Sequence, residues 1–336
     1  MQGILPLAKN REIAKNTVPS MAYDGKEDFA AWQARARAKL EELLGLPFER
    51  CDDQLTIEWK KELEEYTEIR FLFQSETNYF VPAVLRIPNG AEGPLPTVIC
   101  LQGHSRGMHI SLGQPKYPGD EKDISGGDRD FCVRAVKEGY CAIAVEQRCF
   151  GECGGTEKGP NCQESSLNAL LIGRTTAGER VWDIQRLIDV LEKYFADKVD
   201  LEKIVCMGNS GGGTSTFYAS CLEPRIHYSM PSCAVCEYDD SILAVPHCIC
   251  NYIPGIRKYF EMGDLTGLIA PRPFVLVSGY EDNIFPRHGV AKTFAKTQAL
   301  YQAAGAPDNC KLVVGDGGHR FYANDSWPLM NEFLKG

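Results

Sequence analysis

The stretch "VCMGNSGGGTST", residues 205–216, runs from an apolar segment into a cluster of small residues, and its interpretation decides the fold. A phosphate-binding loop of the Walker type needs a Lys-Ser/Thr pair after its glycines, and this stretch has no lysine. A dinucleotide-binding turn needs G-x-G-x-x-G, but the third position counted from Gly208 is Ser210. A flexible linker is not expected between an apolar strand, "KIVCM", and a helix, "TSTFYASCL". The remaining interpretation is G-x-S-x-G at a strand-to-helix turn.

Such a turn presents its serine as a nucleophile. The serine takes a strained backbone conformation, and its neighbours lack side chains so that the strand and the helix can approach closely. Ser210 is therefore the candidate nucleophile, and the backbone N–H of Gly211 points from a helix N-terminus toward the substrate oxygen. A second N–H for this oxyanion is expected from the loop after "TVICLQG", where His104 is the best candidate and Ser105 comes next.

An acid and a histidine follow at the ends of two later predicted strands. "FVLVSGYEDNIFP" predicts a strand that ends beside Glu281 and Asp282, and "LVVGDGGHRF" predicts a strand that ends before His319. Serine, acid and histidine thus occur in the order found in hydrolases whose nucleophile lies at such a turn. We expect His319 to act as the general base and Asp282 to orient it, with Glu281 as the rival acid.

Short, nearly continuous apolar runs predict strands that are buried on both faces of a parallel sheet. These runs are "LPTVICLQG", "YCAIAVEQ", "KIVCMG", "PFVLVSG" and "KLVVGDGG". Upstream, "TEIRFLFQSE" and "NYFVPAVLRIP" alternate around a polar "SETN" turn and predict an antiparallel hairpin. Residues 25–45 and 177–196 carry apolar stripes at helical spacing, and Gly45 with Pro47 is a stop signal for the first helix.

These elements predict an α/β fold: a mostly parallel central sheet, an antiparallel N-terminal hairpin, helices on both faces and an N-terminal helical extension. We assign residues 1–50 to the extension, packed on the main domain, and residues 51–336 to the catalytic α/β domain. Three long connections, 104–128, 151–176 and about 237–270, follow predicted strands and should emerge at the carboxyl edge of the sheet. The last of them is an insertion expected near the active site.

The chain resembles α/β-hydrolases of the dienelactone hydrolase and acetyl xylan esterase-like branch, from about residue 65 to the end. The stretches that carry the resemblance are "VICLQGHSRGMH", "VEQRCFGECGG", "GRTTAGERVWDIQRLIDVL", "CMGNSGGGTST", "LIAPRPFVLVSGYEDNIFP" and "GDGGHRF". One departure is "EQRCFGE", where relatives often carry Asp and Gly around the arginine. The resemblance implies a serine esterase for short acyl esters, chiefly acetyl groups on carbohydrate, that works without a metal or organic cofactor.

The resemblance also bears on individual residues. The family pattern G-x-x-D-x-x-x-P fits Gly279, Asp282 and Pro286, which favours Asp282 over Glu281 as the triad acid. Independently of the resemblance, we assign four further residues to substrate binding: Gln102, Arg148, His247 and Tyr252. For Arg148 we favour the alternative of an internal salt bridge, to Asp183.

Composition excludes several classes of partner. The 36 Lys+Arg against 45 Asp+Glu give a net charge of −9, and no basic stripe with interleaved aromatic residues suggests nucleic-acid binding. No apolar run approaches the ~18 residues of a membrane span. The N-terminal stretch lacks the apolar region of a signal peptide, so we expect a cytoplasmic enzyme acting on a small-molecule ester such as an imported acetylated oligosaccharide. The sequence leaves open whether the chain forms a homo-oligomer.

Fourteen cysteines allow a different class of function. "CAVC" (Cys233, Cys236) followed by "HCIC" (His247, Cys248, Cys250) can be read as a metal-binding module without enzymatic activity. The H-C-x-C half is not a usual ligand spacing, so we expect reduced, mostly buried thiols and no metal. Other hydrolases on the same scaffold, a lactone hydrolase or a peptidase, remain alternatives, although a peptidase would usually carry a large extra gating domain.

Overall fold

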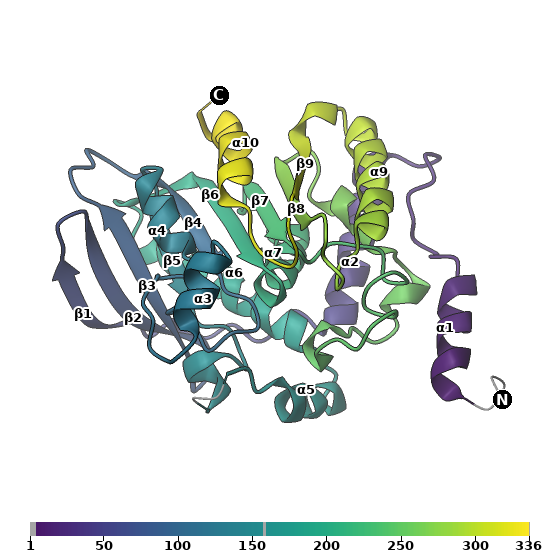
Figure 1. The fold of residues 1–336 in the computed structure, drawn as a ribbon, viewed down its shortest axis with the longest axis horizontal. Helices are drawn as coiled ribbons and strands as arrows, with labels where there is room; N and C mark the ends of the chain where they lie inside the picture. Colours follow the sequence, from purple (N-terminus) through teal and green to yellow (C-terminus); the bar gives the residue numbers. More distant parts are fainter. Residues whose placement is uncertain (1–4, 157–158, 336) are drawn as a thin grey trace.

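The computed structural model describes residues 5–156 and 159–335, and the strands within these ranges form one sheet of nine. The sheet runs across the molecule in the order β1-β2-β3-β5-β4-β6-β7-β8-β9 (Figure 1). The strands are β1 Thr56–Glu62, β2 Tyr66–Glu76, β3 Tyr79–Pro88, β4 Leu95–Leu101, β5 Cys141–Val145, β6 Val199–Asn209, β7 Tyr228–Ser232, β8 Phe274–Gly279 and β9 Cys310–Gly315.

Strand directions divide the sheet into two parts. The pairs from β5 through β4, β6, β7 and β8 to β9 are parallel, whereas β1, β2 and β3 pair antiparallel, and β3 pairs antiparallel with β5. The predicted α/β class, parallel core and antiparallel hairpin are confirmed. The hairpin turn is tighter than predicted, because β2 continues through Glu76 and β3 begins at Tyr79.

Helices cover both faces of the sheet, as predicted. One large apolar cluster contains side chains from α2, α6, α7 and α9, and a second contains side chains from α4 and α10. In Figure 1 the helices pack in layers in front of and behind the strands. The helices are α1 Pro6–Asn16, α2 Phe29–Leu44, α3 Asp120–Gly126, α4 Phe131–Lys137, α5 Cys162–Leu171, α6 Thr176–Tyr194, α7 Gly211–Leu222, α8 Met262–Leu265, α9 Arg287–Ala303 and α10 Ala323–Lys335.

The N-terminal segment has two unlike helices. Helix α2 lies in the larger apolar cluster through the fully buried side chains of Trp32, Leu40 and Leu44, and it ends at Gly45, whose φ of 78° lies in the left-handed region. Helix α1 buries none of its residues and touches the body through Arg11, which donates hydrogen bonds to the carbonyls of residues 243 and 244. The boundary at residue 50 stays a prediction.

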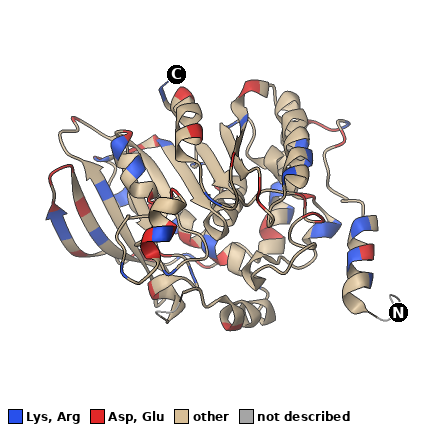
Figure 2. Cartoon of the chain, in the orientation of Figure 1, with Lys and Arg blue, Asp and Glu red and all other residues tan. Residues whose placement is uncertain are grey.

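Charged residues of both signs lie along the edge strands β1 and β2 and on outer helices such as α9, while the central strands carry few (Figure 2). This distribution fits the two parts of the sheet, because antiparallel edge strands can face water and the parallel strands are covered on both sides. No described helix combines the length and the apolar character needed to cross a lipid bilayer.

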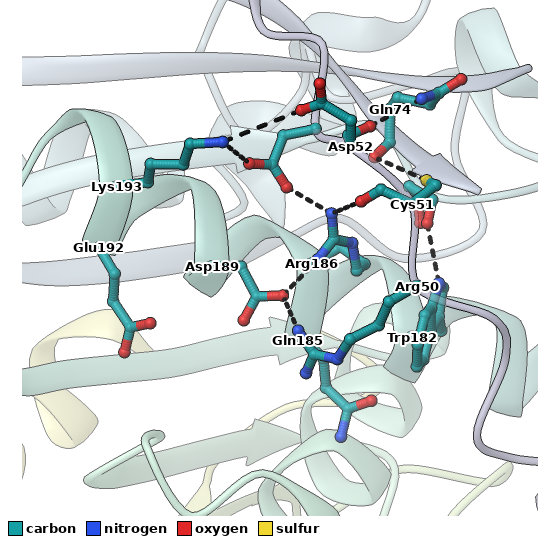
Figure 3. Close-up of polar contacts among 12 residues, drawn as sticks. Arg50, Cys51, Asp52, Gln74, Trp182, Gln185, Arg186, Asp189, Glu192 and Lys193 are labelled. Carbon is teal, nitrogen blue, oxygen red and sulfur yellow. Dashed lines mark hydrogen bonds and ion pairs between the residues drawn. The ribbon is translucent and has the colours of Figure 1, made fainter. Parts of the chain in front are cut away.

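A polar network attaches the chain after the N-terminal helices to α6 (Figure 3). Arg186 on α6 is buried, and it forms an ion pair with buried Asp53, donates to the carbonyl of Cys51 and lies 2.6 Å from a carboxylate oxygen of Asp189. Arg50 reaches the same oxygen of Asp189 at 2.6 Å, but its side chain is 63% exposed. Both arginines therefore contact the same carboxylate oxygen of Asp189, Arg186 from the buried side and Arg50 from the solvent-exposed side.

We expect Arg186→Ala to lower the free energy of unfolding by about 1.5–3 kcal/mol, because it removes the buried partner of the Asp53 carboxylate and leaves only the more exposed Lys193, at 2.9 Å. Arg50→Ala is the matched control, since it removes a solvent-exposed pair to the same acceptor and should cost about 0–1 kcal/mol. Urea unfolding followed by fluorescence measures both. Equal losses for the two variants would show that burial of the Asp53–Arg186 pair does not govern this attachment.

Candidate active site

The turn between β6 and α7 holds Ser210 in an unusual backbone conformation, with φ of 57° and ψ of −122°. Non-glycine residues seldom adopt a positive φ, and such conformations persist where the surrounding structure imposes them. Here the N–H of Ser210 donates to the carbonyl of Ser232 on β7 at 2.8 Å, and its own carbonyl accepts from the N–H of Thr214 at 2.8 Å. The turn thus has the strand–serine–helix geometry predicted from the sequence.

Glycines around Ser210 allow the turn to press against the end of β4. A Cβ atom at Gly212 would lie 2.0 Å from the carbonyl oxygen of Leu101, and one at Gly208 would lie 2.6 Å from the same oxygen. Across the contact, a Cβ atom at Gly103 would lie 2.8 Å from the carbonyl oxygen of Asn209. Real side chains do not fit at such distances, so these positions require glycine for close approach rather than for flexibility.

His319 and Asp282 form a hydrogen-bonded pair at the ends of β9 and β8. Nδ1 of His319 lies 2.8 Å from Oδ2 of Asp282, whose side chain is completely buried. The other carboxylate oxygen accepts the backbone N–H groups of Ile284 and Phe285 at 2.8 and 3.1 Å. Glu281, the rival acid, is exposed at the surface. The geometry therefore favours Asp282 as the partner of His319.

Burial raises the pKa of Asp282, but the hydrogen bond and charge of His319 together with the two backbone donors outweigh it, so the net pKa lies below its ordinary value. Asp282 is accordingly ionised at neutral pH. An ionised, immobilised carboxylate keeps the proton of a neutral imidazole on Nδ1 and leaves Nε2 free to accept a proton. The ring of Phe285 stacks on His319 with centroids 5.9 Å apart and further restricts its orientation.

Ser210 and His319 face the same cavity of about 320 Å³. Residues 103–105 and Gly211 also line it, and because Gly211 is the first residue of α7, its N–H has no acceptor within the helix. The structure thus brings together the predicted nucleophile, base and both segments predicted to supply oxyanion donors, while their catalytic roles remain predictions. The lining residues are Gly103, His104, Ser105, Arg129, Asn209, Ser210, Gly211, Pro246, His247, Cys248, Asn251, Ile284, Phe285 and His319.

A family model for the abhydrolase family matches residues 10–324. The chain belongs to this family. Over 297 residues it is 27% identical to "Putative hydrolase YtaP" of Bacillus subtilis (strain 168). The alignment covers 85% of this abhydrolase and 94% of the relative. It is also 28% identical to the 4-O-methyl-glucuronoyl methylesterase of Phanerochaete carnosa (strain HHB-10118-sp), over 46% of this chain and 44% of the other.

Among solved structures, a protein described as a "putative acetyl xylan esterase" from Bacteroides fragilis NCTC 9343 superimposes with a TM-score of 0.77. The match covers 93% of this abhydrolase and 82% of that chain, at 19% sequence identity. At this level of identity the likeness establishes the shared fold. The α/β-hydrolase resemblance expected from the sequence is confirmed.

Of the four residues assigned to substrate binding, only His247 lines the cavity. Burial is the main cause that lowers its pKa to about 4, and the neighbouring His104 and His319 lower it further. His247 is therefore neutral at physiological pH and can offer one nitrogen as a hydrogen-bond acceptor. Its ring also packs edge-on against Phe285, with centroids 5.3 Å apart.

The other three residues do not line this cavity. Arg148 is held by Asp183 at 2.9 Å and Glu76 at 2.6 Å, so the alternative of an internal salt bridge is correct. Gln102 is buried behind the cavity wall and donates to the carboxylate of Glu146 at 2.8 Å. Tyr252 donates its hydroxyl to the carbonyl of residue 242 and lines a separate, largely apolar groove beside α1. Each of these three polar side chains therefore forms a hydrogen bond or ion pair within the protein.

Arg129 lies in the cavity wall and was not predicted. Its guanidinium donates to the carbonyl of His319 at 3.2 Å and pairs with Asp123 at 3.1 Å. It stands at the end of the long connection 104–128, where no spacing or motif distinguishes one arginine from another. Only the three-dimensional path of this connection brings it to the catalytic edge of the sheet.

Glu146, in the stretch "EQRCFGE", holds the loop after β4 in place. Its carboxylate is buried, accepts from Gln102 and from the N–H of Met108 at 3.1 Å, and would contact any side chain at Gly151. Burial raises the pKa of Glu146 to about 7, and the backbone donors Met108 and Glu152 offset this only in part.

This shift predicts how stability depends on pH. The native state holds the Glu146 proton more tightly than the unfolded chain does. This difference stabilises the native state by on the order of 3 kcal/mol below a pH of about 4.5, and the stabilisation is lost as the pH rises toward 7. Glu146→Gln should remove this decline, and its carbonyl oxygen can still accept the hydrogen bonds from Gln102 and Met108. Urea unfolding of both proteins from pH 4.5 to 8 measures the difference, and parallel pH profiles would contradict the assignment.

Proposed function

We propose that this abhydrolase is a serine esterase that hydrolyses short-chain acyl esters, with acetyl esters of carbohydrates as its substrate class. The observation that carries the proposal is the 2.8 Å hydrogen bond between His319 and buried Asp282, set at the same cavity as a strained Ser210. This is the arrangement that an acyl-transfer triad requires. The names of the similar proteins, an acetyl xylan esterase and a glucuronoyl methylesterase, support an ester of a carbohydrate.

In the proposed reaction the Oγ of Ser210 attacks the ester carbonyl carbon while its proton passes to Nε2 of His319. The oxyanion of the tetrahedral intermediate accepts hydrogen bonds from the backbone N–H groups of Gly211 and His104. Collapse of the intermediate breaks the bond to the alcohol oxygen, which takes the proton from His319. Water then attacks the acyl-enzyme, again losing its proton to His319, and the acid leaves as Ser210 recovers its hydrogen.

The size of the cavity supports a small acyl group. About 320 Å³ is at the lower end for ligand sites, and the neutral imidazole of His247 with the ring of Phe285 forms one wall. All fourteen cysteines are free thiols, which supports the expectation of a reducing, cytoplasmic compartment and hence a soluble, imported sugar ester as substrate.

Arg129 favours a second candidate within the same reaction type. A guanidinium in the cavity wall can bind carbonyl and carboxylate oxygens, and one relative is named as a glucuronoyl methylesterase. The second candidate is therefore hydrolysis of the methyl ester of a uronic acid, in which the sugar supplies the acyl group and methanol leaves. Lactone and peptide hydrolysis use the same triad chemistry, but no lining residue favours them specifically.

Hydrolysis of p-nitrophenyl acetate, butyrate and octanoate, of acetylated xylo-oligosaccharides and of methyl glucuronate by the purified protein tests the two candidates. We expect activity on acetate that falls with chain length, release of acetate from the oligosaccharides, and loss of turnover on the order of 10⁶ in Ser210→Ala. Ser125→Ala, at an exposed serine on α3, is the control. Activity that persists in Ser210→Ala would overturn the triad, and cleavage of methyl glucuronate alone would favour the second candidate.

A separate prediction concerns the acid. Asp282→Asn should reduce kcat by about 10⁴, since an amide cannot hold the imidazole in the required tautomer or stabilise its charged form. Glu281→Gln changes the neighbouring, exposed carboxylate by the same single group and should leave kcat unaltered. Steady-state kinetics on p-nitrophenyl acetate compares them. The reverse result would assign the acid to Glu281.

A further inference from the structure

Four side chains with metal-binding atoms meet beside the cavity. His104 follows β4, and Cys162 is the first residue of α5. The other two, Cys248 and Cys250, lie in the insertion after β7. The ligand atoms of all four side chains lie within 4.8 Å of one another. Nε2 of His104 is 3.1 Å from Sγ of Cys250, which in turn is 3.3 Å from Sγ of Cys248.

We propose that these four side chains bind one structural zinc ion. Three thiolates and an imidazole are a ligand set that zinc uses in closed tetrahedral sites. Zn–S bonds of about 2.3 Å place tetrahedral sulfurs about 3.8 Å apart. The Cys248–Cys250 separation of 3.3 Å would have to widen by about half an ångström, and no pair of ligand atoms is farther apart than 4.8 Å, so small movements bring the four atoms around one ion. The sulfurs of Cys248 and Cys250 are too far apart for a disulfide bond of about 2.05 Å, and all three cysteines are free thiols.

A buried positive charge faces the same cluster. Arg180 on α6 is 2% exposed, and its guanidinium lies 3.7 Å from Sγ of Cys250 and 3.8 Å from Sγ of Cys162. It also donates two hydrogen bonds to the carbonyl of Arg148, and within residues 5–156 and 159–335 no carboxylate forms an ion pair with it. An unpaired buried guanidinium would be strongly destabilising.

Zinc chemistry provides the compensating charge. One Zn²⁺ with three thiolates and a neutral imidazole carries a net charge of −1, which balances the single positive charge of Arg180. With three neutral thiols instead, the guanidinium would meet the Arg148 carbonyl and weak sulfur acceptors, and none of these carries a compensating charge. The charge of this arginine is therefore an observation independent of the ligand spacing, and it indicates the same bound state.

The surroundings also suit a thiolate-bound metal. Cys162 is the first residue of the ten-residue helix α5, where the helix dipole stabilises a negative charge. The ring of Phe150 lies edge-on to His104, with centroids 5.0 Å apart, and 4.1 Å from the guanidinium of Arg180. These contacts shield one side of the cluster from water, which strengthens electrostatic interactions within it.

The ion would join three segments at the edge of the active site. It would tie the loop after β4, whose His104 N–H is the proposed oxyanion donor, to α5 and to the insertion that contributes His247. With four protein ligands the coordination shell has no open position for water or substrate, so the metal is structural and takes no part in ester cleavage. The proposal is consequently independent of the proposed esterase activity.

Metal analysis of the full chain tests the proposal. The wild-type protein, produced in zinc-supplemented medium and gel-filtered under reducing conditions, should contain about one zinc per chain by plasma mass spectrometry and native mass spectrometry. Cys162→Ser and Cys250→Ser should each lose most of it. Cys153→Ser is the matched control, because Cys153 lies nine positions before Cys162 but outside the ligand set, and it should keep the zinc.

A second measurement covers variants that fail to fold. Exchange of the wild-type metal for Co²⁺ should give the visible bands of a tetrahedral site and thiolate-to-cobalt charge transfer, neither of which depends on activity. Wild-type protein without bound metal, or with a disulfide between Cys162 and Cys248 in peptide mass spectra, would overturn the proposal. So would zinc that stays bound in both Cys162→Ser and Cys250→Ser.

Discussion

The catalytic edge of this abhydrolase depends on one close backbone contact, between the end of β4 and the turn that follows β6. The carbonyl oxygen of Leu101 occupies the space that a Cβ atom would need at both Gly208 and Gly212. Only because these side chains are absent can α7 begin directly behind β4, with the N–H of Gly211 and the loop of His104 facing one cavity. The positions of the proposed nucleophile and of the proposed oxyanion donors are thus consequences of the same steric constraint.

Much of this arrangement could be predicted from the sequence, because it depends on local chemistry and on chain order. Five of the six parallel strands in the described sheet contain continuous apolar runs, and the triad candidates stand at the carboxyl ends of three of these, where a parallel sheet brings them together. The strands that were missed lack these signals. β1 reads "TIEWKKE" and is exposed along nearly its whole length, whereas β7 reads "YSMPS" and contains Pro231, which argues against a central strand.

Functions of polar residues in the long connections could not be predicted in the same way. Arg148 and Gln102 follow strands just as His104 does, yet one is neutralised by Asp183 and the other donates to Glu146. Nothing local separates a side chain that satisfies a buried group from one that lines a cavity. The same holds for the cysteines: the alternative interpretation of the sequence as a metal-binding module grouped Cys248 and Cys250 with Cys233 and Cys236, but Cys233 lies beside Asp282 and His319.

The loop after β4 is therefore held from three directions, each by a different interaction. The backbone of Gly103 packs closely against the carbonyl oxygen of Asn209. The buried carboxylate of Glu146 accepts the N–H of Met108, and the ring of His104 contacts Sγ of Cys250 in the cysteine cluster. An oxyanion donor must keep its orientation before the charge develops, since reorganisation during the reaction would raise the barrier. Three independent attachments around the His104 N–H would meet that requirement in the proposed mechanism. They would also account for a buried acid and a thiol cluster so near Ser210, which uses neither in the proposed reaction.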